Sequence, residues 1–127
     1  EKNVKVIIED CGYTSVWDIF EDELEALFGL PSFPILDMSN IMANIRAHYD
    51  LKEASALEAV KKNEVPILFI HGSDDLFVKT EMLEPLFKAT SAPKDKLVID
   101  GAGHGEARLR DPETYFKKVF DFIDQYR

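Results

Sequence analysis

Three short apolar runs, rich in β-branched residues, restrict the fold of this chain more than any other feature. They are "VKVII" (Val4–Ile8), "VPILFI" (Val65–Ile70) and "KLVID" (Lys96–Asp100). Nearly continuous apolar runs of this length are typical of strands that are covered on both faces. Longer segments with helical periodicity follow each run. The order strand, several helices, strand, helix, strand, helix predicts three parallel strands joined by right-handed crossovers.

Helix-capping signals mark the first and the last predicted helix. Ser15 and Asp18 form a capping-box pattern, and Gly29 supplies a helix stop. Asp111 followed by Pro112 gives an N-cap and a proline at the first helical position. Apolar residues then fall on one face of each helix. In the first these are Trp17, Phe20, Leu24, Leu27 and Phe28, and in the last Tyr115, Phe116, Val119, Phe120, Phe122 and Ile123.

Further helices are expected between the strands. Two cover about 41–49 and 55–62, and a third covers 80–89, where Pro85 removes a backbone donor and should kink it. The connection from about 11 to 64 is far longer than one covering helix needs. A connection of this length can accommodate an inserted lid or cap. Apolar cap residues could line a substrate pocket, or could simply pack between helices: Phe33, Ile35, Leu36, Met38, Ile41 and Met42.

Charge and composition exclude several classes of function. The formal net charge of −9 argues against nucleic-acid binding, which needs a basic face. Positions 1–60 hold 12 acidic against 4 basic residues, which we interpret as a solvated helix surface. No apolar run is long enough to span a membrane, and no signal-peptide pattern opens the chain. Cys11 is the single cysteine, so no intrachain disulfide is expected, and we interpret it as a small buried residue.

Polar residues of catalytic type follow the second and third predicted strands. Asp74 and Asp75 come after the second strand, and His104 lies in the glycine-rich stretch "GAGHG" after the third. Ligands of open α/β sheets gather at the carboxyl ends of the strands. The 29 positions between Asp75 and His104 fit one helix plus one strand, so both side chains should emerge from neighbouring strand ends. A carboxylate that orients a histidine is the supporting half of a nucleophilic triad.

The stretches "PILFIHGSDDLFV" and "KLVIDGAGHGEA" resemble the last two strands of the α/β-hydrolase fold. The resemblance assigns the catalytic acid to Asp75, the third residue after a His-Gly pair, and the catalytic base to His104. From the residues alone, Asp75 could instead close a turn while Asp74 orients the base. The family often has Asp at the position of Ser73 and Pro at that of Lys79. The opening "VKVIIEDCGYTSV" resembles the strand after the nucleophile strand. The resemblance thus implies the carboxyl-terminal half of this fold, with a three-stranded parallel half-sheet flanked by helices. It also implies a helical cap inserted at 14–62, and strands and loops at 63–127 that carry the acid and the base.

The nucleophile of such an enzyme is missing from the sequence. None of the six serines stands in a Gly-x-Ser-x-Gly setting, the turn that presents the catalytic serine. The resemblance therefore implies a carboxyl-terminal fragment of a serine esterase or related acyl hydrolase, without a cofactor and inactive alone. Its expected partners are a small ester or acyl substrate and the absent amino-terminal part of the same protein. The small sheet should also leave an unpaired edge near Val4, through which copies could associate.

Other interpretations use the same residues differently. The chain could be a small acidic α/β domain that binds a ligand or regulates a partner without catalysis. A divalent ion could be held by His71, Asp74, Asp75 and His104, although no His-x-x-x-His or paired-cysteine spacing is present. We expect His71 to be a structural hydrogen-bonding residue, and His48 to face solvent in the cap.

Overall fold

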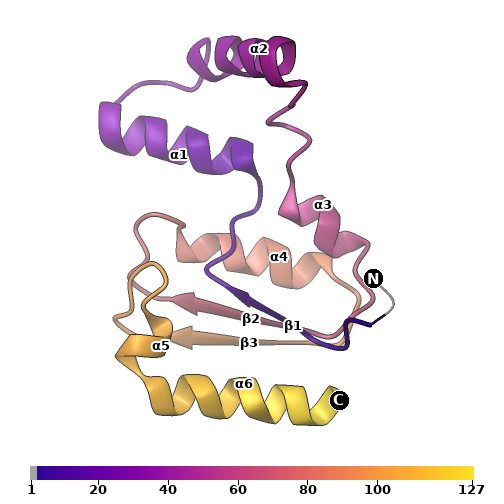
Figure 1. Ribbon diagram of the computed structural model, residues 1–127. Helices are drawn as coiled ribbons and strands as arrows, with labels where there is room; N and C mark the ends of the chain where they lie inside the picture. Colours follow the sequence, from indigo (N-terminus) through magenta and orange to yellow (C-terminus); the bar gives the residue numbers. More distant parts are fainter. Residues whose placement is uncertain (1–2) are drawn as a thin grey trace.

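The three strands form one parallel sheet in the order β1-β2-β3. The computed structural model describes residues 3–127 (Figure 1). In chain order the elements are β1 (Ile7–Asp10), α1 (Val16–Phe28), α2 (Ile35–Ala47), α3 (Ala56–Lys61), β2 (Ile67–Gly72), the 3-10 helix η1 (Thr80–Met82), α4 (Leu83–Ala89), β3 (Lys94–Ile99), α5 (Ala107–Arg110) and α6 (Pro112–Tyr126). The predicted fold class is confirmed. Among the described helices none is both long and apolar enough to cross a membrane.

The first strand lies further along the chain than its apolar run predicted. Pairing starts at Ile7, which lies opposite Ile67 of β2, and it ends at Asp10. β2 follows Pro66 and β3 follows Pro93, residues that have no N–H to donate to a neighbouring strand. Val4 therefore precedes the paired region and is exposed. The sequence had suggested that the free edge of the sheet begins near Val4. In the structure this edge is formed by Ile7–Asp10.

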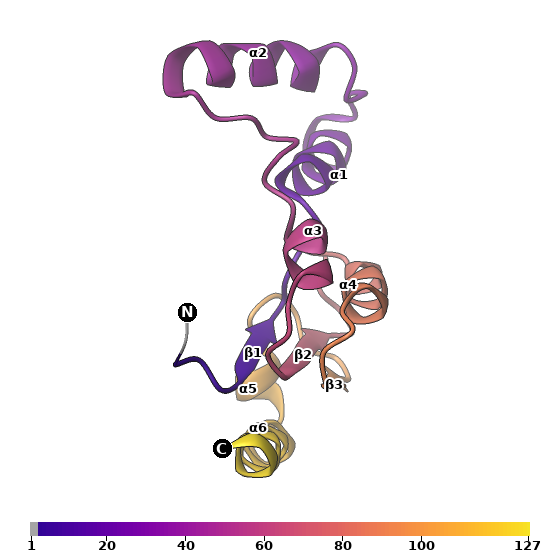
Figure 2. The same ribbon diagram turned by 90° about the vertical axis from the view of Figure 1, so that its right-hand side faces the viewer.

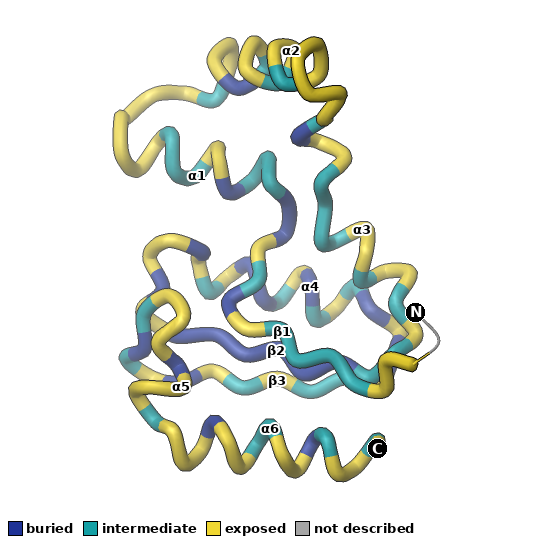
Figure 3. Tube along the Cα trace, in the orientation of Figure 1, coloured by how far each residue is buried: buried dark blue, intermediate teal, exposed yellow. Residues whose placement is uncertain are grey.

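Both faces of β2 are buried, because helices cover the sheet from two sides (Figure 3). On one face Leu68 and Ile70 pack with Tyr115 and Phe122 of α6. On the other face Ile67 and Phe69 pack against α3 and α4. This two-sided cover explains why β2 reads as a continuous apolar run and not as an alternating one.

Two of the helices predicted for the cap stand away from the sheet, whereas the third does not. α1 and α2 form a hairpin that stands away from the sheet on the side of α3 and α4 (Figures 1 and 2). α3, which also lies within 14–62, packs on the sheet through Leu57 and Val60. α1 has the predicted caps: the Ser15 hydroxyl accepts the N–H of Asp18, and Gly29 ends the helix with a φ of 62°.

Three local predictions differ from the structure. α2 begins at Ile35, directly after Pro34, whereas the sequence predicted a helix that starts only at about 41. The expected kink at Pro85 is wrong, because α4 begins at Leu83 and Pro85 lies in its first turn, where an N–H has no intrahelical partner. α5, a single turn after the glycine-rich stretch, was not predicted.

Candidate active site

The loop after β2 buries the carboxylate of Asp75 and fixes both of its oxygens. Oδ1 accepts the backbone N–H groups of Phe77 at 3.0 Å and Val78 at 2.8 Å. These bonds form a tight turn directly after the strand, and Asp75 is only 4% exposed. Its Oδ2 is thereby directed toward the neighbouring loop after β3.

His104 comes from that neighbouring loop and meets Asp75. The Nδ1 atom of His104 lies 2.9 Å from Oδ2 of Asp75. Gly101 and Gly105 flank the histidine, and both have a φ of 68°, a left-handed conformation that suits glycine. The imidazole remains 44% exposed, with the Phe77 ring edge-on at a centroid distance of 5.0 Å. The turn therefore presents the ring to solvent while one of its nitrogens is held.

The charge state of Asp75 follows from these contacts. Burial by itself raises the pKa of Asp75, but the hydrogen bonds from His104 and from the N–H groups of Val78 and Phe77 outweigh burial and hold this pKa below its usual value. An ionised carboxylate can only accept, so the His104 Nδ1 carries the proton of this hydrogen bond. In the neutral ring this leaves Nε2 with a free lone pair, which is the state of a general base.

Hydrogen bonds join the two loops, and their close approach is possible only because residue 72 is a glycine. The Asp74 N–H donates to the carbonyl of Ala102 at 3.0 Å, and the Gly101 N–H donates to the Ser73 hydroxyl at 2.8 Å. A Cβ atom at Gly72 would lie 2.1 Å from the Ala102 carbonyl oxygen. Asp74 itself is exposed and accepts the hydroxyl of Ser73. Of the two adjacent acids, only Asp75 contacts His104.

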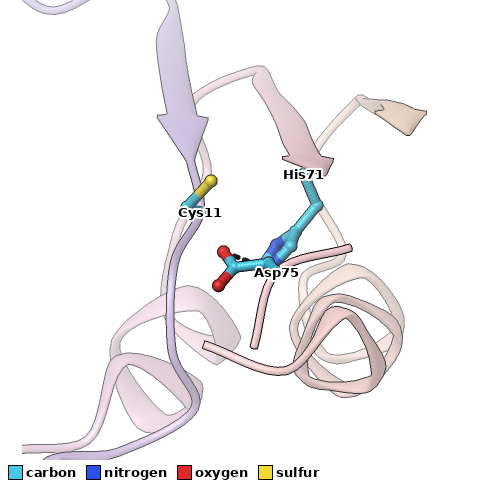
Figure 4. A group of neighbouring side chains, drawn as sticks. All are labelled: Cys11, His71 and Asp75. Carbon is cyan, nitrogen blue, oxygen red and sulfur yellow. Dashed lines mark ion pairs between the residues drawn. The ribbon is translucent and has the colours of Figure 1, made fainter. Parts of the chain in front are cut away.

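His71 and Cys11 lie against Asp75 on its buried side (Figure 4). His71 is completely buried, and its Nε2 lies 2.8 Å from the Val78 carbonyl and 3.4 Å from Oδ2 of Asp75. Because a carbonyl only accepts, this Nε2 carries a proton and ties the strand end to the turn around Asp75. This agrees with the structural role expected for His71. His48 is exposed at the end of α2.

The ligand atoms of these three side chains lie within 4.8 Å of one another, but most of them already take part in hydrogen bonds. Burial raises the pKa of the Cys11 thiol to about 12, so the sulfur is protonated when no metal is bound. The protonated Nε2 of His71 offers no lone pair, and Asp75 is already occupied by hydrogen bonds. The sequence-based set of His71, Asp74, Asp75 and His104 is not brought together as a whole, since Asp74 faces solvent.

Cys11 supports the histidine turn, a role that the sequence analysis did not assign. The Gly105 N–H donates to its Sγ at 3.2 Å, next to His104. The thiol in turn donates to Asp10, which also accepts the Tyr115 hydroxyl at 2.9 Å. The sequence offered one indication of this role. Cys11 directly follows β1, and the carboxyl ends of parallel strands meet at one edge of the sheet, where His104 also lies.

Comparison with known proteins identifies the fold of this chain. The structure of Pyrococcus horikoshii acylaminoacyl peptidase matches 99% of this chain with a TM-score of 0.72, at 14% identity and over 20% of its own length. The Pyrococcus furiosus esterase Pf2001 matches 98% of the chain with a TM-score of 0.68, at 16% identity and over 46% of its length. A puromycin-hydrolyzing peptidase of Mycobacterium tuberculosis matches 80% with a TM-score of 0.55, at 20% identity and over 15% of its length. The chain thus has an α/β-hydrolase fold, with three parallel strands flanked by helices.

In sequence, the chain is similar to the uncharacterized protein YqkD of Bacillus subtilis strain 168. The two are 30% identical over 117 residues, which cover 92% of this chain but 38% of YqkD. The chain therefore spans well under half the length of this curated relative. No family model matches the sequence.

Proposed function

We propose that this chain supplies the acid and the base of a serine α/β-hydrolase that cleaves ester or related acyl bonds. The observation that carries the proposal is the 2.9 Å contact between a buried, doubly anchored carboxylate and a solvent-facing imidazole. The fold shared with an esterase and two peptidases supports the same class of reaction. The nucleophile would be a serine in a part of the longer protein that precedes Glu1, in line with the limited share of YqkD that the chain spans.

In the proposed reaction Nε2 of His104 takes the proton of that serine as its oxygen attacks the substrate carbonyl. The ring then carries a positive charge, which the ionised Asp75 stabilises through Nδ1–H. His104 gives the proton to the leaving group, and a water molecule repeats the sequence to release the acid. The anchoring of Oδ1 by Phe77 and Val78 keeps the carboxylate from rotating away. No cofactor is required by this scheme.

The test is hydrolysis of a reactive aryl ester by the full-length protein that contains this chain. We expect His104→Ala and Asp75→Asn each to lower kcat by at least about 10³-fold, because each removes part of a unit that transfers protons. His48→Asn is the matched control: it replaces the exposed histidine at the end of α2, where φ is 52° and asparagine is tolerated. Activity retained by both site variants would refute the proposal, as would equal losses in the control.

The 127-residue chain alone should not hydrolyse the ester, because it has no activated nucleophile. Purified activity that depends on His104 would show that one of its own serines serves this purpose. The competing idea of an acidic binding domain has less support. Of the two adjacent acids after β2, Asp75 is buried and only Asp74 is exposed to a ligand in solution. The idea of a binding domain would be favoured if neither His104→Ala nor Asp75→Asn changed hydrolysis by the full-length protein.

A further inference from the structure

The hairpin of α1 and α2 contacts the loop that holds Asp75. Of its two helices, α1 lies nearer the sheet (Figures 1 and 2). The buried residue of α1, Ile19, forms a small apolar cluster with Val78 and Met82, separate from the clusters on the two faces of the sheet. Val78 is 1% exposed, so water is excluded from this contact. Helix α1 therefore packs directly on the loop after β2.

Val78 is also part of the candidate site. Its backbone N–H donates to Oδ1 of Asp75 at 2.8 Å, and its carbonyl lies 2.8 Å from Nε2 of His71. The same residue thus anchors the carboxylate with its backbone and binds α1 with its side chain. A shift of Val78 would withdraw a donor from Oδ1 and let the carboxylate rotate. The other oxygen of that carboxylate, Oδ2, would then lose its alignment with His104.

A charge pair fixes α1 next to this apolar contact. The Lys79 ammonium donates to Oδ1 of Asp22 at 2.6 Å, across 57 positions of the sequence. Asp22 lies three residues after Ile19 and so on the same face of α1, and Lys79 directly follows Val78. Proline, which the α/β-hydrolase family often has at the position of Lys79, could not form this pair. The pair is therefore a feature of this chain and not of the fold in general.

The contact between α1 and the loop is small enough to separate. A cleft of about 460 Å³ opens beside the charge pair, and Asp18 of α1 and Pro85 of α4 are among its lining residues. The chain enters and leaves the hairpin side by side, since the Val16 N–H donates to the Ala54 carbonyl at 2.9 Å. A hairpin that is held at its base and at one small contact can swing as a unit.

We propose that Ile19 and Asp22 of α1 are positioning residues for the reaction proposed above. With α1 docked, they hold the turn that fixes the Asp75 carboxylate against His104. With α1 lifted, that turn loosens and the acid and the base lose their alignment. The catalytic part of this inference rests on the proposed function, whereas the physical link between α1 and the turn does not depend on it.

Amide exchange in the full-length protein tests whether α1 holds the turn. Asp22→Lys places a like charge beside Lys79 and should push α1 away. We expect the N–H groups of Phe77 and Val78 to exchange at least about 10-fold faster in this variant, since both donate to Asp75. The double variant with Asp22→Lys and Lys79→Asp reverses the charge pair and should restore slow exchange.

Asp37→Lys is the matched control for the change of charge. Asp37 lies on α2 and pairs with Lys52 at 3.1 Å, so its replacement breaks an ion pair within the cap and leaves α1 docked. It should not alter exchange in the turn. Ile19→Ala removes the apolar half of the contact without a change of charge and should speed exchange of the same two amides. Unchanged exchange in both Ile19→Ala and Asp22→Lys would overturn the proposal, as would equal acceleration in the control.

Ester hydrolysis by the same variants separates a positioning role from a merely structural one. In Asp22→Lys, kcat should fall at least about 10-fold while KM changes less than about 2-fold, and the reversed pair should recover most of the loss. Faster exchange with an unchanged kcat would overturn the positioning role. If the wild type does not hydrolyse the ester, the proposed function fails, and the exchange rates still decide whether α1 holds the turn.

Discussion

At the scale of single residues, Gly72 decides whether the two site-bearing loops can meet. A Cβ at this position would overlap the Ala102 backbone, which cannot move without displacing the loop that carries His104. We expect Gly72→Ala to lower the free energy of unfolding by about 3 kcal/mol and to separate His104 from Asp75. Urea unfolding measures the first effect, and ester hydrolysis by the full-length protein measures the second.

Gly103→Ala is the control for that substitution. There the added Cβ would lie 3.0 Å from Oε2 of Glu106, the far end of a flexible side chain. The side chain can move aside, so stability should change by less than about 1 kcal/mol. If Gly72→Ala were as mild as Gly103→Ala, the close approach of the two loops would not be a constraint on the site.

Glu9 should make the stability of the 127-residue chain depend on pH. Burial raises its pKa from 4.5 in the unfolded chain to about 7 in the folded one, so the folded state binds more protons between these values. The stability contributed by protonation is present below about pH 4.5 and is lost as pH rises through 7, by up to about 3 kcal/mol. Urea unfolding at pH 5 and pH 8 measures the change. Glu9→Gln should flatten it, and an unchanged slope in that variant would contradict the assignment.

At the scale of elements, the sequence predicted what local chemistry determines. The caps at Ser15 and Asp111 and the apolar run of β2 depend on neighbours in the chain, and all three occur as expected. The start of β1 could not be predicted from its own residues, because it is set by where β2 begins after Pro66. The proximity of Asp75 and His104 was predictable from strand order, whereas the support from Cys11 needed three-dimensional coordinates. The catalytic roles remain predictions.

The packing of the apolar helix faces also could not be predicted from sequence patterns alone. In α1 only Ile19 is buried, whereas Leu27 and Phe28 are each 68% exposed. Ile19 is not among the residues that helical periodicity placed on the apolar face of α1, so periodicity did not find the side that packs against Val78 and Met82. On α6 the stripe divides: Phe122 is buried against the sheet, while Phe120 is 59% exposed. Of the six apolar residues between Phe33 and Met42 that the sequence offered as a pocket lining, Leu36 alone is buried, so packing within the described residues does not account for the other five.

At the scale of the whole molecule, the exposed faces and the free edge of β1 favour association. The N–H groups of Ile7 and Cys11 donate to β2, and donors alternate along a strand, so those of Ile8 and Asp10 point to the free side. Unpaired edges recruit other chains. We expect the 127-residue chain to form dimers or larger species at high concentration, as sedimentation would measure.

Amide exchange can tell which surface joins the copies. If β1 is the interface, the amides of Ile8 and Asp10 should be protected at high concentration and lose protection on dilution, while those of buried β2 stay protected throughout. A chain that stays monomeric at high concentration would contradict the role given to β1. Association without protection of Ile8 and Asp10 would instead assign the contact to the exposed apolar faces of α1, α2 and α6.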